Sequence, residues 1–127
     1  MIGEASELVT DEYTAAALGT GLVAAYSTPS MIALMEIASV AAIKNELNIG
    51  QTSVGTEIQV KHLAPTPVGM HVRARSVLLQ IDGSHLQFKV EAWDDQEIIG
   101  EGIHMRAIID SERFVHRLKR KKTQIDR

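Results

Sequence analysis

One uninterrupted stretch decides the fold: Ser27-Thr-Pro-Ser-Met-Ile-Ala-Leu-Met-Glu-Ile-Ala-Ser-Val-Ala-Ala-Ile-Lys-Asn-Glu-Leu47. Its hydroxyl residues followed by Pro29 are typical of a helix start, with a hydroxyl at the cap and proline at the first helical position. From Pro29 to Leu47 there is no glycine and no second proline, and apolar side chains cover more than one face of the helical turn. We therefore predict a long buried helix that ends at Asn48-Ile-Gly50, where the glycine suits a left-handed stop.

After this helix, the chain changes to the alternation of apolar and polar residues that is typical of β-strands. Strands are predicted over residues 52–64, 70–81, 86–92 and 98–109. The breaks between them are the proline-containing segment 64–69, an Asp82-Gly83 hairpin signal, and Asp94-Asp95. In the first of these strands the even-numbered positions are mostly apolar, and His62 is one of them.

The two ends of the chain carry weaker signals. Residues 3–10 show little pattern, whereas 11–18 predict a short helix and 22–26 a short strand. From Ser111 onward the sequence predicts a short basic helix or a frayed tail.

One buried helix followed by a meander of four strands indicates an α+β fold in which a curved antiparallel sheet wraps the helix, the hot-dog architecture. A chain of 127 residues fits a single domain over residues 1–127. One sheet around one helix leaves a face and the sheet edges uncovered, so we expect a homodimer.

Composition removes several classes of function. The absence of cysteine excludes a disulfide framework, a thiolate-held zinc site and a cysteine nucleophile. The N-terminus has acidic residues where a signal peptide carries basic ones, and the most apolar stretch, 31–43, is shorter than the ~20 residues of a membrane span. We therefore expect a cytoplasmic protein without a membrane partner. Nucleic acid is disfavoured as a partner because aromatic residues are only 4% of the chain.

Glu36 is the most unusual residue of the predicted helix, because its neighbours are apolar on every side. Burying an unpaired carboxylate is costly, or raises its pKa until the group is neutral. A structural pairing in a polar seam or a dimer interface explains such a residue, and so does a catalytic carboxylate.

His62 lies on the strand face that must pack against the helix, so its imidazole is expected to meet the carboxylate of Glu36. Taken alone, His62 is equally explained as a core histidine satisfied by one hydrogen bond. Thr28 stands at the helix N-terminus, where free N–H groups and the helix dipole favour an oxyanion, although a plain capping role explains it as well. Our hypothesis is a catalytic set of Thr28, Glu36 and His62.

Other residues are candidates for contacts with a ligand. Gly55 interrupts an otherwise bulky strand, which predicts either a bulge or the close approach of a ligand or another backbone. Gly100, Gly102, His104 and Arg106 share one strand face, where the glycines make room for the helix or a ligand and Arg106 pairs with Glu36, with substrate, or with a surface carboxylate.

The residues after Ser111 are strongly basic and hold 7 of the 13 Lys and Arg of the chain. They either contact the phosphate groups of a bound coenzyme A or are simply solvated.

Four motifs resemble those of the fluoroacetyl-CoA thioesterase-like hot-dog proteins, in their spacing as well as in their residues. The motifs are Ser27-Thr-Pro-Ser-Met-Ile-Ala-Leu-Met-Glu36, Thr52-Ser-Val-Gly-Thr56, Val60-Lys-His-Leu-Ala-Pro-Thr-Pro-Val-Gly69 and Gly102-Ile-His-Met-Arg106. The resemblance runs from about Val9 to Leu118.

This resemblance implies a homodimer that hydrolyses acyl-CoA, with coenzyme A as part of the substrate and with neither a metal nor another cofactor. It also implies that Thr28, Glu36 and His62 are catalytic, and that Gly55 and Arg106 contact the substrate. Leu22 stands where the fluoroacetyl-specific enzyme has a phenylalanine gate. The alternatives are a non-catalytic acyl-CoA-binding or regulatory module and, less consistent with the motifs, a hot-dog hydratase.

Overall fold

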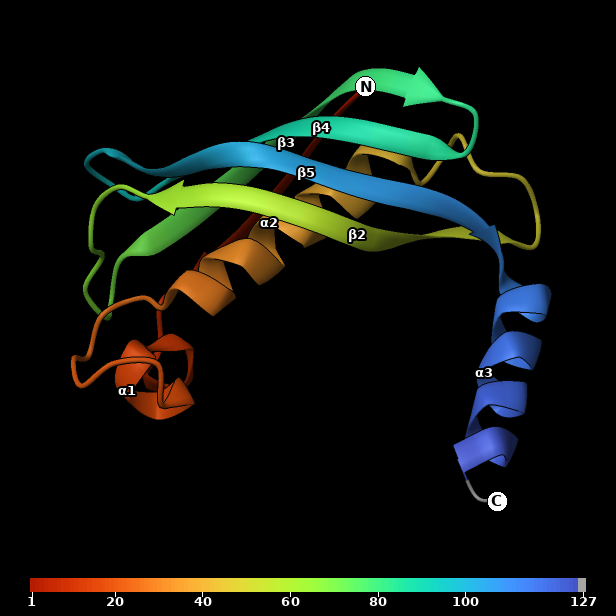
Figure 1. Cartoon of the computed structure of the whole chain (residues 1–127). Coiled ribbons are helices and arrows are strands. Elements are labelled where there is room, and N and C mark those ends of the chain that lie inside the picture. Colours follow the sequence, from red (N-terminus) through yellow and green to blue (C-terminus); the bar gives the residue numbers. More distant parts are fainter. Residues whose placement is uncertain (126–127) are drawn as a thin grey trace.

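The structure is a computed structural model that describes residues 1–125. Its elements are β1 (Ile2–Leu8), a 3-10 turn η1 (Asp11–Tyr13), α1 (Ala15–Leu18), α2 (Thr28–Ile43), β2 (Gln51–His62), β3 (His71–Asp82), β4 (His85–Trp93), β5 (Ile98–Asp110) and α3 (Ser111–Ile125). The five strands form one antiparallel sheet in the order β1-β3-β4-β5-β2, and this sheet curves over α2 (Figure 1). The predicted α+β hot-dog architecture is therefore confirmed.

The core lies between α2 and the concave face of the sheet. Its largest fully buried side chains are Met31, Leu34 and Met35 on the helix and Phe88 and Ile99 on the strands. On the strands, buried residues alternate with exposed or half-buried ones, as in the run from Leu86 to Ala92. The hairpin between β3 and β4 turns at the predicted position, where Gly83 has a φ of 62°.

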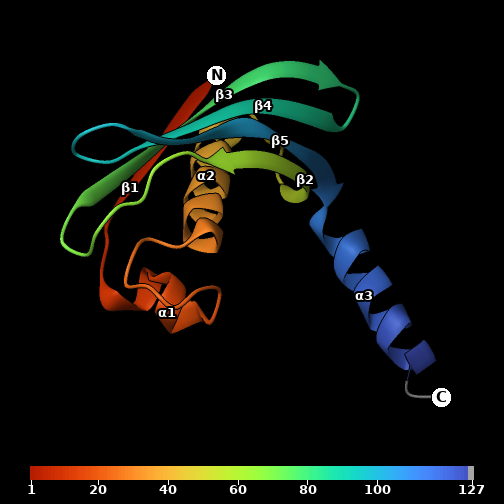
Figure 2. The ribbon, with the colours of Figure 1, turned by 60° about the vertical axis from the view of Figure 1, so that its left-hand side comes forward.

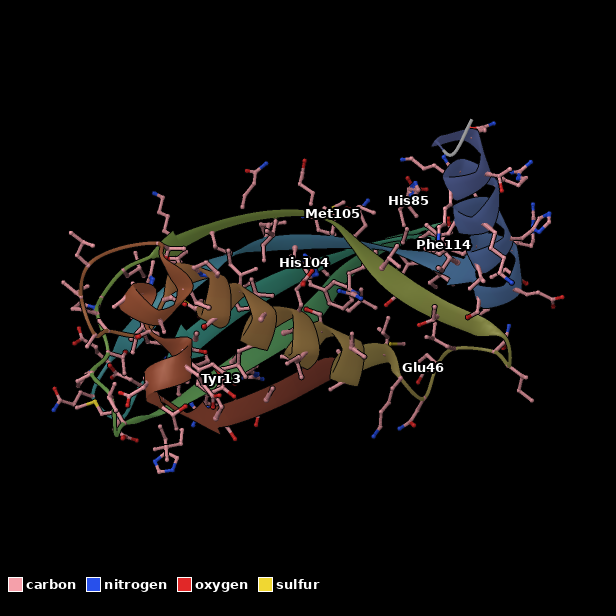
Figure 3. The ribbon with its side chains drawn as sticks, turned by 90° about the horizontal axis from the view of Figure 1, so that it is seen from below. Tyr13, Glu46, His85, His104, Met105 and Phe114 are labelled. Atoms are coloured by element: carbon pink, nitrogen blue, oxygen red, sulfur yellow. The ribbon has the colours of Figure 1, made fainter. Side chains whose placement is uncertain are left out.

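The helix α2 is not buried on every side, so our prediction for it was wrong on one face. It packs mainly against β1 and β3 and much less against β4 and β2. Ile37 and Val40 on its outer face are 56% and 44% exposed. Figure 3, which views the molecule from the helix side, shows α2 lying along the sheet, with β2 beside it at the sheet edge.

The weakly patterned N-terminal segment forms an edge strand that we did not predict. This strand, β1, pairs antiparallel with β3, and Leu8 lies opposite His71 at one end while Ile2 lies opposite Val77 at the other. Gly3 allows this strand to lie against α2, because a Cβ on Gly3 would collide with the backbone of Ala38 and Ala42.

Two further expectations need correction. Residues 22–26 do not form a strand: they are a loop in which Ala25 and Tyr26 make isolated bridges to Pro67 and Thr14. The strand predicted over 52–64 contains a bulge between Gly55 and Glu57, which changes the alternation. Before the bulge, the odd-numbered Ser53 and Gly55 therefore face Arg106 and Glu36. The even-numbered residues lie on this face of the sheet only after the bulge.

Two helices leave the sheet at its opposite ends. Figures 1 and 2 agree that α1 and α3 both lie on the same side of the sheet as α2, and that α3 projects away from the rest of the chain. Within residues 1–125, none of the helices is both long and apolar enough to cross a membrane.

We expect Gly3→Ala to lower the free energy of unfolding by about 1–3 kcal/mol, because the new methyl group meets helix backbone that cannot move aside. Ser6→Ala on the same strand is the control, since Ser6 is exposed. Urea unfolding of the two variants tests this, and equal stabilities would show that β1 does not press on α2 at Gly3.

Candidate active site

Thr28 is the first residue of α2, and its hydroxyl is not used for capping. The cap is Ser27, whose Oγ accepts a hydrogen bond of 3.1 Å from the N–H of Ser30. A capping role for Thr28, which the sequence left open, therefore belongs to its neighbour. The Thr28 side chain is exposed and can contact other groups.

The loop that leads into Thr28 is fixed on both sides. The Tyr26 hydroxyl donates a hydrogen bond of 2.6 Å to Glu7 on β1, and the N–H of Ser27 donates to the carbonyl oxygen of Tyr13. Burial raises the pKa of Tyr26 far above its ordinary value, and the Glu7 carboxylate acts in the same direction, so this phenol keeps its proton. The start of α2 is thereby held against β1 and η1.

His62 is the last residue of β2, and it lies beside Thr28. Its Nδ1 is 2.8 Å from the Thr28 Oγ1. Its Nε2 is buried and has no hydrogen-bond partner within residues 1–125. Burial lowers the pKa of His62, although a hydrogen bond with the backbone of Ala64 acts in the opposite direction. The imidazole is therefore neutral near pH 7 and can accept a proton.

A cavity of about 480 Å³ opens beside this pair. The start of α2, the end of β2 and the loop after α1 line it, with Val23, Thr28, His62 and Pro65 among the contributing residues. Leu22, the position of the expected gate, is fully exposed, while its neighbour Val23 faces the cavity.

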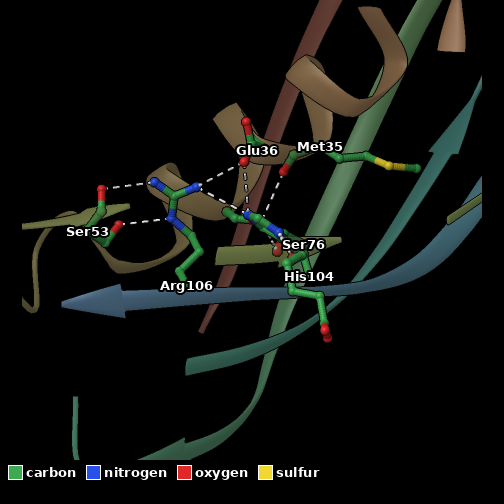
Figure 4. A network of polar contacts seen from close by, with 8 residues as sticks. Met35, Glu36, Ser53, Ser76, His104 and Arg106 are labelled. Carbon is green, nitrogen blue, oxygen red and sulfur yellow. Dashed lines mark hydrogen bonds and ion pairs between the residues drawn. The ribbon is translucent and has the colours of Figure 1, made fainter. Parts of the chain in front are cut away.

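Glu36 lies in a second group, at the middle of α2. Its Oε1 is 3.7 Å from the Arg106 Nη1 and 3.5 Å from the His104 Nε2, and its side chain is 42% exposed (Figure 4). Arg106 is nearly buried, and it also donates to the Oγ and the carbonyl oxygen of Ser53, at 2.9 and 3.0 Å. The guanidinium group thus has several fixed acceptors, and the expected pairing of Arg106 with Glu36 is present.

The hydrogen bonds of His104 determine its protonation state. Its Nδ1 is 2.8 Å from the carbonyl oxygen of Glu57, so this nitrogen carries the hydrogen and donates it. Its Nε2 then accepts from the Arg106 Nη1 at 3.2 Å. Burial lowers the pKa of His104 most, and the hydrogen bond with the Glu57 backbone raises it by less. The charge of Arg106 lowers this pKa further, and the charge of Glu36 has the smallest effect, in the opposite direction. The cation that faces Glu36 is therefore Arg106 and not His104.

The three glycines that we singled out make room for three different groups. A Cβ on Gly55 would collide with the Glu36 carboxylate and would also lie close to His104. A Cβ on Gly100 would meet the side chain of Met31 on α2, and one on Gly102 would meet the backbone of β2. Gly55 is therefore the glycine that belongs to the candidate site. Within one chain, the group that lies against Gly55 is the carboxylate of Glu36.

The expected contact between Glu36 and His62 is not made within one copy of the chain. Glu36 is eight residues after Thr28, which is a rise of about 12 Å along an α-helix, while His62 is hydrogen-bonded to Thr28. The predicted catalytic residues thus form two groups: Thr28 with His62, and Glu36 with Arg106 and His104. Sequence analysis did not single out Ser53 and gave His104 no role, since a bulge that shifts the alternation hides which residues share a face.

The chain matches the fluoroacetyl-CoA-specific thioesterase family over residues 9–112. It belongs to this family. The fluoroacetyl-CoA thioesterase of Streptantibioticus cattleyicolor is 38% identical over 96 residues, which are 76% of this chain and 69% of that enzyme.

Solved structures agree with this membership. A mutant of the fluoroacetyl-CoA thioesterase FlK in complex with acetyl-CoA is 31% identical and superposes with a TM-score of 0.90, over 95% of this chain and 96% of that one. A thioesterase-superfamily protein of Thermus thermophilus is 26% identical, with a TM-score of 0.92 over 99% of this chain and 93% of its own. The resemblance that we inferred from the four motifs is therefore confirmed for the fluoroacetyl-CoA-specific thioesterase family.

Within residues 1–125, no group of three or more His, Asp and Glu side chains is placed to hold a metal ion. The ionisable groups of the candidate site are Glu36, Arg106, His62 and His104, in the two groups described above.

The lowered pKa of His104 makes the stability of the protein depend on pH. The unfolded chain binds a proton near the ordinary pKa of 6.5, while the folded chain resists it. Stability from this group is therefore complete above that pH and is lost as the pH falls below it. We expect the free energy of unfolding to fall between about pH 7.5 and 5.5, and to fall less in His104→Gln, which keeps an acceptor for Arg106.

Urea unfolding at the two pH values checks this prediction. The pKa of His62 is also lowered, but this effect is common to the wild type and to His104→Gln. The difference in pH dependence between the two proteins therefore comes from His104. An identical pH dependence in the variant would mean that His104 is protonated as easily in the folded chain as in the unfolded one.

Proposed function

We propose that this protein hydrolyses the thioester of short-chain acyl-CoA to the free acid and coenzyme A. The observation that carries the proposal is the 2.8 Å contact between the Thr28 hydroxyl and the His62 imidazole, at a helix N-terminus and beside a cavity. Membership of the fluoroacetyl-CoA-specific thioesterase family supports it, as does the acetyl-CoA complex of a relative with the same fold.

In the proposed mechanism, the thioester carbonyl lies at the start of α2. The N–H of Thr28 and the positive end of the helix dipole stabilise the negative charge that develops on the carbonyl oxygen. Pro29 has no N–H, and the N–H groups of Ser30 and Met31 already donate to Ser27. His62 accepts a proton through Nδ1, either from a water molecule that attacks the carbonyl or from Thr28 as its hydroxyl attacks, and then returns a proton to the departing thiolate. When Thr28 attacks, the acyl group stays on its oxygen, and a water molecule activated by His62 then hydrolyses this ester, which releases the free acid and restores Thr28. These steps use groups of the chain itself and no cofactor.

We further propose that the working form is a homodimer joined along β2. This strand is an edge of the sheet, and one side of its backbone pairs with β5 while the other is open in the described chain. The outer face of α2 exposes Ile37 and Val40, and α2 covers the β1 and β3 half of the sheet more than the β2 half. A second copy paired antiparallel along β2 covers all three surfaces and keeps both helices on the same side of the sheet.

This arrangement supplies the missing carboxylate. Glu36 lies beside the exposed face of α2, and the buried Nε2 of His62 needs a hydrogen-bond acceptor or donor. Within one chain the helix rise separates them, but antiparallel helices related by a two-fold axis bring the middle of one helix toward the start of the other. We therefore assign the orienting carboxylate of each His62 to Glu36 of the second copy, while Arg106 and Gly55 hold that carboxylate in place.

Val23 and the exposed Leu22 belong to the loop beside the cavity, which makes this loop the candidate determinant of acyl-group choice. A panel of acyl-CoAs from acetyl to hexanoyl, with fluoroacetyl-CoA included, defines the preferred substrate. The cytoplasmic location stays a prediction.

We expect His62→Ala and Glu36→Gln each to lower kcat on the preferred acyl-CoA by about 10²-fold or more, because each removes a part of the proton-transfer system. Thiol release measures the rate, and thermal unfolding checks that the fold survives. Ser6→Ala is a control for surface substitution. If the wild-type protein binds acyl-CoA tightly by calorimetry but releases no thiol, the protein is a non-catalytic binding module.

The assignment of Glu36 to the second copy is tested by mixing two inactive variants. In a dimer of His62→Ala with Glu36→Gln, one site combines the intact His62 of one chain with the intact Glu36 of the other. Random subunit exchange is then expected to restore roughly a quarter of the wild-type rate, since half of the dimers are mixed and each has one intact site. If both residues act within one chain, mixing restores nothing.

A further inference from the structure

The helix α3 is a basic helix without a role in the site described so far. Residues 111–125 contain six Lys and Arg and one Glu, and the described side chains are exposed except for Ser111 and Phe114, which are half-buried. Arg113, Arg117 and Arg120 are spaced as residues of one helix face, and they line a shallow hollow together. The family match ends at residue 112, so this helix is not part of what family membership explains.

Within one chain, α3 is at the wrong end of the sheet to serve the cavity beside Thr28. It follows Asp110, which pairs with Gln51 at the first residue of β2, whereas His62 is the last residue of that strand. Eleven residue steps at about 3.3 Å each separate the two ends by roughly 36 Å. Figure 1 shows the same separation, with α1 at one end of the sheet and α3 at the other.

An antiparallel pairing of β2 with the β2 of a second copy reverses this relationship. A pairing centred on the strand places Gln51 opposite His62 of the second copy, so α3 emerges beside the cavity of that copy. Both α1 and α3 lie on the same side of the sheet as α2, so α3 reaches the cavity side and not the outer face (Figure 2). This step rests on the proposed homodimer and on the proposed function.

The apolar surfaces at the two ends of the sheet match as well. Val115 and Leu118 are 48% and 53% exposed on α3, and Leu22 and Val23 are 101% and 61% exposed on the loop at the cavity. In the antiparallel dimer these surfaces belong to different copies and lie at the same end. Contact between them buries both and leaves the arginine face of α3 directed away from that contact, because Arg117 is about 100° from Leu118 around the helix.

We propose that α3 of one copy binds the phosphate groups of the coenzyme A held in the site of the other copy, through Arg117 and Arg120. The nucleotide end of coenzyme A carries a diphosphate and a 3′-phosphate, and the planar guanidinium group matches phosphate oxygens with two parallel hydrogen bonds. The reacting thioester is at the opposite end of the same ligand. Recognition of the phosphates is thereby placed on a different element, and a different chain, from Thr28 and His62.

Calorimetric binding of coenzyme A and of pantetheine, which lacks all the phosphates, tests the proposal without depending on hydrolysis. We expect Arg117→Gln/Arg120→Gln to weaken coenzyme A binding by about tenfold or more, as the loss of charge-assisted hydrogen bonds predicts, and to leave pantetheine binding unchanged. The matched control is Arg73→Gln/Arg75→Gln, which removes two exposed arginines from β3. Equal coenzyme A affinity in wild type and the α3 variant overturns the proposal.

A second experiment asks which copy the helix serves. In a dimer of His62→Ala with Arg117→Gln/Arg120→Gln, the site with an intact His62 receives the intact α3 only if the helix crosses to the other copy. The mixed dimer is then expected to show the wild-type KM for acyl-CoA. A KM as high as that of the α3 variant alone overturns the crossing. Absence of thiol release from the wild-type protein refutes the proposed hydrolysis, and the calorimetric comparison still decides the phosphate site.

Discussion

One helix is too narrow to cover a five-stranded sheet, and the rest of the molecule follows from this mismatch. Five strands spaced about 4.8 Å apart make a sheet roughly 20 Å wide, whereas an α-helix with its side chains is about 10 Å across. The helix α2 therefore lies against the β1 and β3 half and leaves the other half, the β2 edge and its own outer face with less cover. Ile37 and Val40 on the outer face of α2 stay exposed for this reason.

The candidate catalytic residues lie in two separate groups, and the surroundings of the two groups differ. Arg106 is almost buried, and a buried guanidinium group needs acceptors, which Ser53 and Glu36 provide. This ion pair fixes Glu36 at the middle of α2, and Gly55 leaves the space that its carboxylate occupies. His62 is only partly satisfied. Its Nδ1 is hydrogen-bonded to Thr28, whereas its Nε2 has no hydrogen-bond partner within residues 1–125. Within residues 1–125 the carboxylate of Glu36 therefore has its partners, whereas one imidazole nitrogen of His62 has none.

Much of this could be predicted from the sequence, and the failures have physical causes. Periodicity and turn signals predicted the helix, four strands and their connections, because those elements are long and are separated by segments with glycine, proline or aspartate. The strand β1 was missed because it is short and lies close to α2 through Gly3, whose lack of a side chain removes the apolar signal. The loop 22–26 was mistaken for a strand, since an exposed apolar run resembles a buried one when no burial is known.

The sequence named candidate catalytic residues but did not predict all of their contacts. Thr28, Glu36 and His62 were predicted to form one catalytic set, whereas the rise of the helix separates Glu36 from Thr28 and the chain forms two groups. The bulge at Gly55 further concealed that Ser53 faces Arg106. Thr28 and His62 are 34 residues apart, and periodic patterns name such residues without pairing them because the period is local.

The arginines of the protein illustrate how burial separates tasks that share one chemistry. Arg106 is buried, and its guanidinium group is paired with Glu36 and hydrogen-bonded to Ser53 in place of water. Burial lowers the pKa of Arg106, and the Glu36 carboxylate acts in the opposite direction. Arg117 and Arg120 on α3 are exposed and keep their hydration, so they can exchange water for the phosphates of a ligand without leaving another group unpaired. A guanidinium group that holds a carboxylate and one that is available to bind an anion therefore need different surroundings. This chain provides them on different elements, with Arg106 on β5 and with Arg117 and Arg120 on α3.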